Sequence, residues 1–138
     1  MNERVKIKPD LKAACLSEAL DVIRDVGIED LSLREVARRL GVSHQAPYRH
    51  FASRDHLLAE IVIHCFERFD AHLDQAPTTD DAMGDLHRMG ELSLDYATRY
   101  PLEYHIMFGA KLPDAEAHPE ILERSCASFE HLREALAR

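Results

Sequence analysis

The residues with the greatest capacity for chemistry in this 138-residue sequence are concentrated in one short segment, GVSHQAPYRHF (41–51). The segment combines a serine, two histidines, a glutamine, a tyrosine and an arginine, whose side chains hydrogen-bond in several directions. Such groups are costly to bury without partners and are suited to a polar surface. The sequence contains no nucleophile elbow, glycine-rich phosphate loop or local metal-ligand spacing. We therefore expect a binding protein and not an enzyme, with no cofactor and no metal.

Two predicted helices must position this segment. The first begins at Ser32, where SLRE reads as a capping box in which Ser32 caps the amide of Glu35 and Glu35 reaches back. It ends at Gly41, because glycine enters the left-handed turn geometry at little cost. The second predicted helix starts with Ser43 as its N-cap and ends near Phe51.

The link between these helices is only three residues long, which permits nothing but a sharp turn. This arrangement is a helix-turn-helix, whose second helix enters the major groove of DNA. That second helix has only Ala46, Pro47 and Phe51 to bury, with Pro47 predicted as a compact plug against the preceding helix. A helical hairpin within an all-α core is the alternative, but its second helix would offer more apolar surface. We therefore expect double-stranded DNA as the partner.

Nine residues are candidates for contact with DNA. Six suit phosphate contacts, which position a protein without specifying sequence: Ser32, Arg34, Ser43, Tyr48, His50 and Arg54. Three are predicted to read bases, because glutamine pairs with adenine while histidine and arginine favour the acceptors of guanine: His44, Gln45 and Arg49.

The formal net charge of −8 is unusual for a protein that binds a polyanion, but it is unevenly distributed. Residues 1–57 carry 10 Lys and Arg against 9 Asp and Glu, whereas residues 58–138 carry 7 against 16. The N-terminal part therefore tolerates a polyanion that the remainder repels. No apolar run approaches the roughly 20 residues of a membrane span, and the N-terminus lacks the apolar core of a secretion signal. We expect a cytoplasmic protein with no membrane partner.

Hydrophobic periodicity predicts an all-α protein. About seven helices are expected, over approximately residues 9–26, 32–40, 43–51, 54–73, 80–99, 101–108 and 119–138. The apolar stripe of the last one, at Phe129, Leu132 and Leu136, is still periodic where the sequence stops. This pattern predicts that a further C-terminal portion, or another chain, packs against the stripe.

The stretch LSLREVARRLGVSHQAPYRHFASRDHLL (31–58) is similar in order and spacing to the N-terminal domain of TetR-family transcriptional regulators. YPLEYHIMFG (100–109) resembles a segment of the ligand-binding domain in one branch of that family. The resemblance implies a three-helix DNA-binding head over residues 1–55, joined by a long fourth helix to a partial ligand-binding body over 56–138. It also implies a ligand-responsive repressor that binds a palindromic operator as a homodimer. The family's two C-terminal dimerisation helices are absent from this sequence.

The resemblance further implies a cavity for a small apolar effector in the body. Apolar and aromatic side chains at helical spacing are the candidates for its lining: Phe66, Phe69, Met89, Leu92, Tyr96, Tyr104, Met107 and Phe108. Two other classes of function stay open. A helix-turn-helix used for protein–protein contact would show no salt-dependent DNA binding, and an all-α metal sensor or enzyme using the nine histidines would retain stoichiometric metal.

Overall fold

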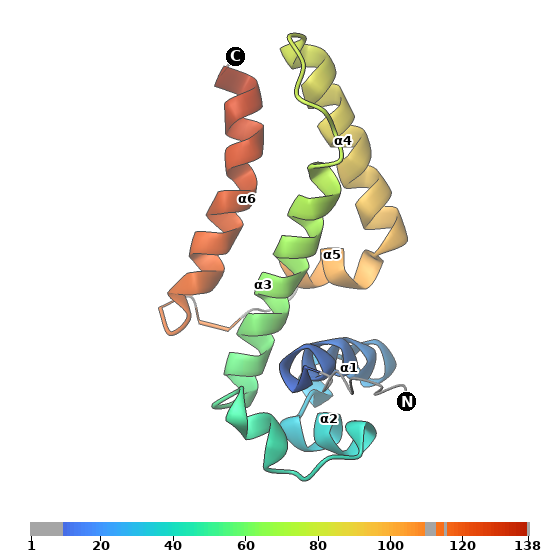
Figure 1. Ribbon diagram of the computed structural model, residues 1–138, viewed down its shortest axis with the longest axis vertical. Helices are drawn as coiled ribbons and strands as arrows, with labels where there is room; N and C mark the ends of the chain where they lie inside the picture. Colours follow the sequence, from blue (N-terminus) through green and yellow to red (C-terminus); the bar gives the residue numbers. More distant parts are fainter. Residues whose placement is uncertain (1–9, 110–112, 115, 138) are drawn as a thin grey trace, which may run out of the picture. The chain divides into compact units, whose positions relative to one another are not determined.

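The structure of the chain, a computed structural model, describes residues 10–109, 113–114 and 116–137. Pro9 and Arg138, which were predicted to begin the first helix and end the last, lie outside these residues. All regular structure in the described part of the chain is helical (Figure 1), which confirms the all-α prediction. The elements are α1 (Leu11–Val26), η1 (Ile28–Asp30), α2 (Leu33–Leu40), η2 (Ala46–Arg49), α3 (Arg54–Leu73), α4 (Ala82–Arg99), α5 (Pro101–Phe108) and α6 (Pro119–Ala137), where η denotes a 3₁₀-helix.

The chain forms two compact units, Met1–Leu57 and Leu58–Arg138, called here the N-terminal and C-terminal units. Helix α3 runs across this division as one continuous helix of 20 residues. Its first turn belongs to the N-terminal unit and the remainder to the C-terminal unit.

In the N-terminal unit, α1 supplies the largest part of the core. Asp10 caps the helix by accepting hydrogen bonds from the backbone N–H groups of Lys12 and Ala13. Gly27 ends the helix with φ of 91°, a backbone conformation that would be strained for a residue with a side chain. One face of α1 is buried at Cys15, Leu16, Ala19, Leu20, Val22 and Ile23. This face packs against α2 and η2.

Helix α2 begins and ends where the sequence predicts, but only half of the predicted capping box forms. Ser32 Oγ accepts a hydrogen bond of 3.1 Å from the N–H of Glu35. The carboxylate of Glu35 does not reach back to Ser32, because it accepts hydrogen bonds from Arg38 and Arg39 instead. Gly41 closes the helix in the left-handed region with φ of 68°, as expected.

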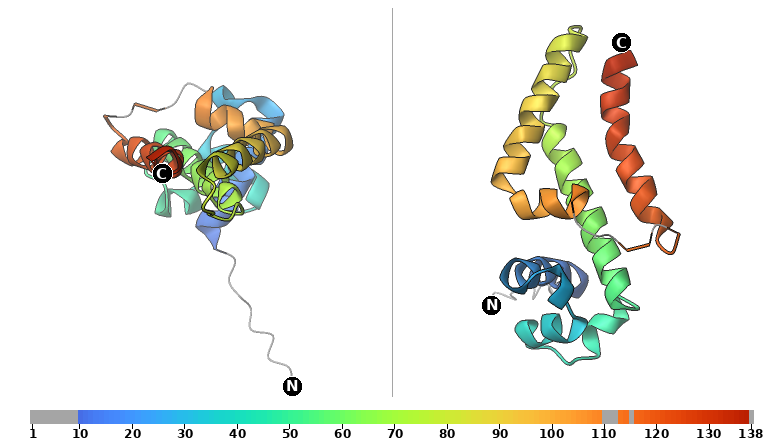
Figure 2. Two further views of the ribbon diagram at one scale, coloured as in Figure 1. Left: turned by 90° about the horizontal axis from the view of Figure 1, so that it is seen from above. Right: turned by 180° about the vertical axis from the view of Figure 1, so that it is seen from behind.

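In the C-terminal unit, α4 packs against α5 and α6, and in both side views α4 and α6 flank the C-terminal half of α3 (Figures 1 and 2). Edge-to-face aromatic contacts connect α3 to its neighbours. The ring of Phe66 lies 5.8 Å from that of Phe108, and the ring of Phe69 lies 5.3 Å from that of Tyr96. None of the helices in the described part of the chain has the length and apolarity needed to cross a membrane.

Candidate nucleic-acid interface and cavity

The second helix of the motif differs from the prediction of an α-helix over residues 43–51. Only η2 is helical there, and it is a single 3₁₀ turn. Because Pro47 has no N–H, it cannot donate to the Ser43 carbonyl as an α-helical residue would. The N–H of Ala46 donates to that carbonyl instead, at 3.0 Å. Ser43 therefore contributes its carbonyl and not its side chain, and the prediction of Ser43 as a helix N-cap is wrong.

The short segment is nevertheless held firmly by buried residues. Ala46 and Pro47 are buried where η2 packs against α1 and α2, which confirms the prediction of Pro47 as a core plug. The Pro47 carbonyl accepts hydrogen bonds of 3.0 Å from the N–H groups of both His50 and Phe51. Phe51 is fully buried, and its ring makes an edge contact with that of His56 at 5.9 Å.

Around these anchors lies a group of exposed polar side chains. Its members have no hydrogen-bonding or ionic side-chain partner among the residues that the structure describes, and they are Arg34, Ser43, His44, Gln45, Tyr48, Arg49 and His50. We call these seven residues the polar face. All seven are among the nine predicted DNA contacts.

The neighbouring arginines of α2 are, in contrast, occupied. Arg38 donates two hydrogen bonds to the carboxylate of Glu35, at 2.9 and 2.7 Å, and Arg39 donates to Glu35 at 3.1 Å and to Asp25 at 2.6 Å. These bonds, from Arg38 first and then Arg39, lower the pKa of Glu35 to about 2. Their contribution to stability is therefore present above the ordinary carboxyl pKa of 4.5 and is lost as the pH falls towards 2. The network ties α2 to α1 and leaves Arg34 for other partners.

Arg54, predicted to contact phosphate, makes hydrogen bonds within the protein. Its Nε donates to the carbonyl of Leu31 at 2.8 Å, and its Nη2 donates to the carbonyl of Ile28 at 2.5 Å. The guanidinium thereby satisfies backbone groups of the connection between α1 and α2. We treat Arg54 as a residue that positions α2, a role for which the sequence carries no signal because the acceptors lie more than 20 positions away.

Replacing Arg54 by alanine should lower the free energy of unfolding of the N-terminal unit by about 1.5–3 kcal/mol, the usual contribution of hydrogen bonds from a charged group. Arg49→Ala is the matched control, since Arg49 is exposed and belongs to the polar face. It should change stability by no more than about 0.5 kcal/mol. Urea unfolding followed by circular dichroism measures both, and equal effects of the two substitutions would contradict the positioning role.

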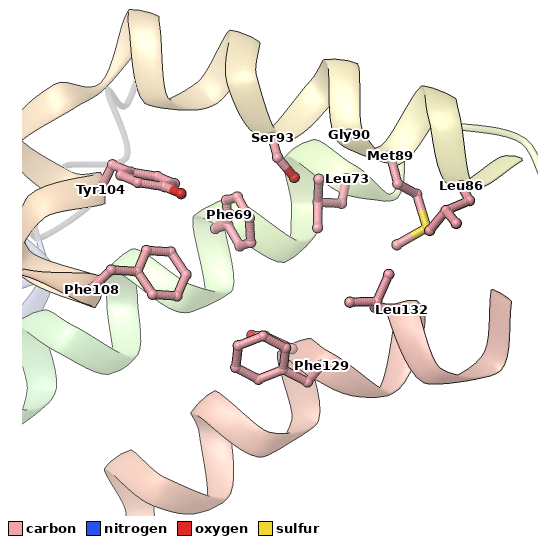
Figure 3. A pocket seen from close by; sticks show the side chains of 11 residues that line it. Phe69, Leu73, Leu86, Met89, Gly90, Ser93, Tyr104, Phe108, Phe129 and Leu132 are labelled. Atoms are coloured by element: carbon pink, nitrogen blue, oxygen red, sulfur yellow. The ribbon is translucent and has the colours of Figure 1, made fainter. Parts of the chain in front are cut away.

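The C-terminal unit contains a cavity of about 360 Å³ between α3, α4, α5 and α6 (Figure 3). Its lining consists of Phe69, Leu73, Leu86, Met89, Gly90, Ser93, Tyr104, Phe108, Ser128, Phe129 and Leu132. Four of the eight residues predicted for a cavity lie in this lining: Phe69, Met89, Tyr104 and Phe108. The other four do not line the cavity. Phe66, Tyr96 and Met107 are buried in the core, and Leu92 is half-buried elsewhere on α4.

Seven lining residues were missed from the sequence. A criterion of large apolar side chains excludes Gly90, Ser93 and Ser128, although each is small enough to leave room for a ligand. Phe129 and Leu132 belong to the apolar stripe of α6, which the sequence marked as lacking a partner. The apolar stripe of α6 therefore indicated an apolar contact in the sequence, whereas nothing in the sequence marked Gly90, Ser93 and Ser128 as cavity residues.

No group of three or more His, Cys, Asp or Glu side chains that could hold a metal ion occurs within the described residues.

The buried anchors, the glycine turn and the polar face together define a helix-turn-helix protein. Residues 16–61 match the model of a family described as bacterial regulatory proteins, tetR family. The HTH-type transcriptional regulator Rv1816 of Mycobacterium tuberculosis is 30% identical over 105 residues, an alignment that covers 70% of this chain and 42% of the relative.

The similarity to solved structures extends over more of the chain. The TetR family transcriptional regulator PfmR from Thermus thermophilus has a TM-score of 0.71 and 26% identity, covering 89% of this chain and 68% of that one. A protein of unknown function from Rhodococcus sp. RHA1 has a TM-score of 0.79 and 25% identity, covering 98% and 70%. Residues 16–61 therefore belong to the tetR family of bacterial regulatory proteins, and the described chain shares the fold of a solved TetR family regulator. The chain spans less than half the length of the curated relatives it matches.

Proposed function

We propose that this protein is a transcriptional regulator that binds double-stranded DNA through the polar face of its helix-turn-helix. The observation that carries the proposal is that seven exposed polar side chains lack partners among the described residues, while the adjacent Arg38 and Arg39 are paired. Polar groups without internal partners can exchange their hydrogen bonds to water for hydrogen bonds to an external polar surface. A regulator that binds chromosomal DNA works in the cytoplasm, the compartment that the sequence predicts.

The members of the polar face divide by position. Arg34 lies in the first turn of α2, where Ser32 retains a hydroxyl hydrogen to donate, so this helix start suits a phosphate. Ser43, Tyr48 and His50 suit further phosphates on either side of η2. His44, Gln45 and Arg49 are assigned to base edges in the major groove.

Family membership supports the finer parts of the proposal. We propose that two copies bind a palindromic operator, with their η2 segments in successive major grooves about 34 Å apart. We further propose that the protein is a repressor and that a small apolar effector binds the cavity. Helix α3 carries Arg54 at one end and the lining residues Phe69 and Leu73 at the other. A shift of its C-terminal turns can therefore change the spacing of the two heads.

A fluorescence titration of DNA from upstream of the protein's own gene tests this function at two salt concentrations. We expect specific binding, with the affinity falling by about a thousandfold between 50 and 200 mM salt if six or more phosphates are contacted. A scrambled duplex of the same composition is the control and should bind far more weakly. Absence of any salt-dependent binding would favour the alternative of a protein–protein module.

A further inference from the structure

The cavity of the C-terminal unit has a size that limits what it can hold. Its volume of about 360 Å³ lies near the lower end of the range of roughly 300–1,000 Å³ that is usual for small-molecule sites. A molecule of one or two rings fits such a volume. Phe129 and Leu132 of α6 border the cavity on the side opposite Met89 and Ser93 of α4 (Figure 3).

The lining excludes charge. None of the eleven lining residues carries an ionisable carboxylate, amine, guanidinium or imidazole. Charged residues next to the lining in sequence pair with one another, Arg68 with Glu103 at 3.7 Å and Asp70 with Arg124 at 2.8 Å. A charged ligand would lose its hydration without gaining a counter-charge, which is strongly unfavourable.

The lining also favours a flat ring. Phe69, Tyr104 and Phe108 form an aromatic cluster, with ring centroids 6.4, 6.0 and 4.8 Å apart for the three pairs. Phe108 and Phe129, from α5 and α6, both border the cavity, yet 47% and 55% of their surfaces are exposed (Figure 3). An aromatic ligand would cover these two rings with the contact geometry that aromatic pairs prefer.

Two hydroxyls in the lining, those of Ser93 and Tyr104, have no hydrogen-bond partner among the described residues. Serines within helices often donate to a carbonyl of the preceding turn, as Ser125 does to Leu122 at 2.9 Å and Ser128 does to Arg124 at 3.3 Å. Ser93 makes no such bond to any described residue, and its hydroxyl points into the cavity (Figure 3).

We propose that the cavity binds a small uncharged aromatic molecule that carries one hydrogen-bonding group. Its ring packs against Phe108 and Phe129, and its polar group meets the hydroxyls of Ser93 and Tyr104. This inference narrows the effector of the proposed function to a chemical class, and it rests on that function only for the regulatory consequence of binding.

Isothermal titration of the 138-residue chain with 2-naphthol and with 2-naphthoate tests the ligand class. The two probes share a ring system, but the second carries a carboxylate. We expect saturable binding of 2-naphthol and binding of 2-naphthoate at least about tenfold weaker. Equal affinities, or no saturable binding of 2-naphthol, would overturn the proposal.

Two substitutions test the location of the site. Ser93→Ala should weaken 2-naphthol binding by about threefold to tenfold, the value of one hydrogen bond, whereas Ser125→Ala should not change it. Gly90→Leu should abolish binding, since a Cβ at Gly90 meets nothing within 4 Å and the added side chain can enter the cavity. Gly90→Ala controls for folding. If Ser93→Ala and Gly90→Leu both leave the affinity unchanged, the ligand does not occupy this cavity.

The same preparations separate this inference from the proposed function. If the protein binds 2-naphthol but not DNA, the proposed DNA-binding function is wrong. If it binds DNA but not 2-naphthol, the proposed class of ligand is wrong. If a second copy of the chain covers the cavity instead, 2-naphthol binding will decline as the protein concentration rises and dimers form. That result would also overturn the proposal.

Discussion

Replacing Phe51 by alanine is expected to unfold the N-terminal unit and to abolish DNA binding. Phe51 is fully buried, contacts His56 at 5.9 Å and anchors the end of the segment that carries the polar face. Truncating a buried phenylalanine to alanine costs about 3–5 kcal/mol, because the cavity left behind is only partly filled. In a unit of this size such a loss takes most of the available stability. We expect the melting temperature of the unit to fall by more than about 10 °C.

Tyr48→Ala is the matched control for that experiment. Tyr48 is a neighbouring aromatic residue, but 51% of its surface is exposed. Its replacement should leave the melting temperature almost unchanged while weakening DNA binding through the lost phosphate contact. Thermal unfolding followed by circular dichroism distinguishes the two variants. A Phe51→Ala protein that melts like the wild type would show that the polar face is not anchored in this way.

The second large effect is expected at the ion pair between α3 and α6. Arg124 Nη2 lies 2.8 Å from Asp70 Oδ2, and the two side chains are 32% and 8% exposed. Arg124→Met leaves the Asp70 carboxylate buried without a counter-charge. Breaking a fully buried pair costs about 3–5 kcal/mol. Because Arg124 remains partly exposed, we expect the free energy of unfolding of the C-terminal unit to fall by about 2–3 kcal/mol.

The same helix offers a control of the same type. Arg133 pairs with Glu130 on the exposed face of α6, with 76% and 49% of the side chains accessible. Arg133→Met should therefore change stability by less than about 0.5 kcal/mol. The double substitution Asp70→Leu with Arg124→Met should recover most of the loss, since it removes both buried charges. If urea unfolding shows that Arg124→Met and Arg133→Met lower the free energy of unfolding by the same amount, the buried pair does not hold α6 against α3.

The sequence predicts those features of the fold that local chemistry determines. Helix α5 begins at Pro101 and ends before Gly109 as expected, and α2 lies between Ser32 and Gly41 as expected. The error at η2 has a local cause, because Pro47 was placed inside an α-helix that starts at Ser43, whereas its missing N–H favours a 3₁₀ turn from Ala46.

The candidate sites were less completely predictable, because they depend on contacts between distant parts of the chain. Nothing near Arg54 in the sequence indicates that its guanidinium satisfies carbonyls of the α1–α2 connection. In the same way, Gly90, Ser93 and Ser128 line the cavity through the packing of α4 and α6, not through their own character. The exposure of the polar face could be expected from the sequence, because the segment that carries most of it has many polar residues and few apolar ones.

Reading of the DNA sequence by the polar face is tested most directly by comparing the wild-type chain with the double variant His44→Ala and Gln45→Ala. Both are titrated against the operator duplex and a scrambled duplex at one salt concentration. We predict that the ratio of the two affinities falls by about tenfold or more in the variant, since a good base contact discriminates by about 1–3 kcal/mol. The affinity for the scrambled duplex should stay nearly constant, because the phosphate contacts are retained. An unchanged ratio would contradict the assignment of the polar face as the surface that reads DNA sequence.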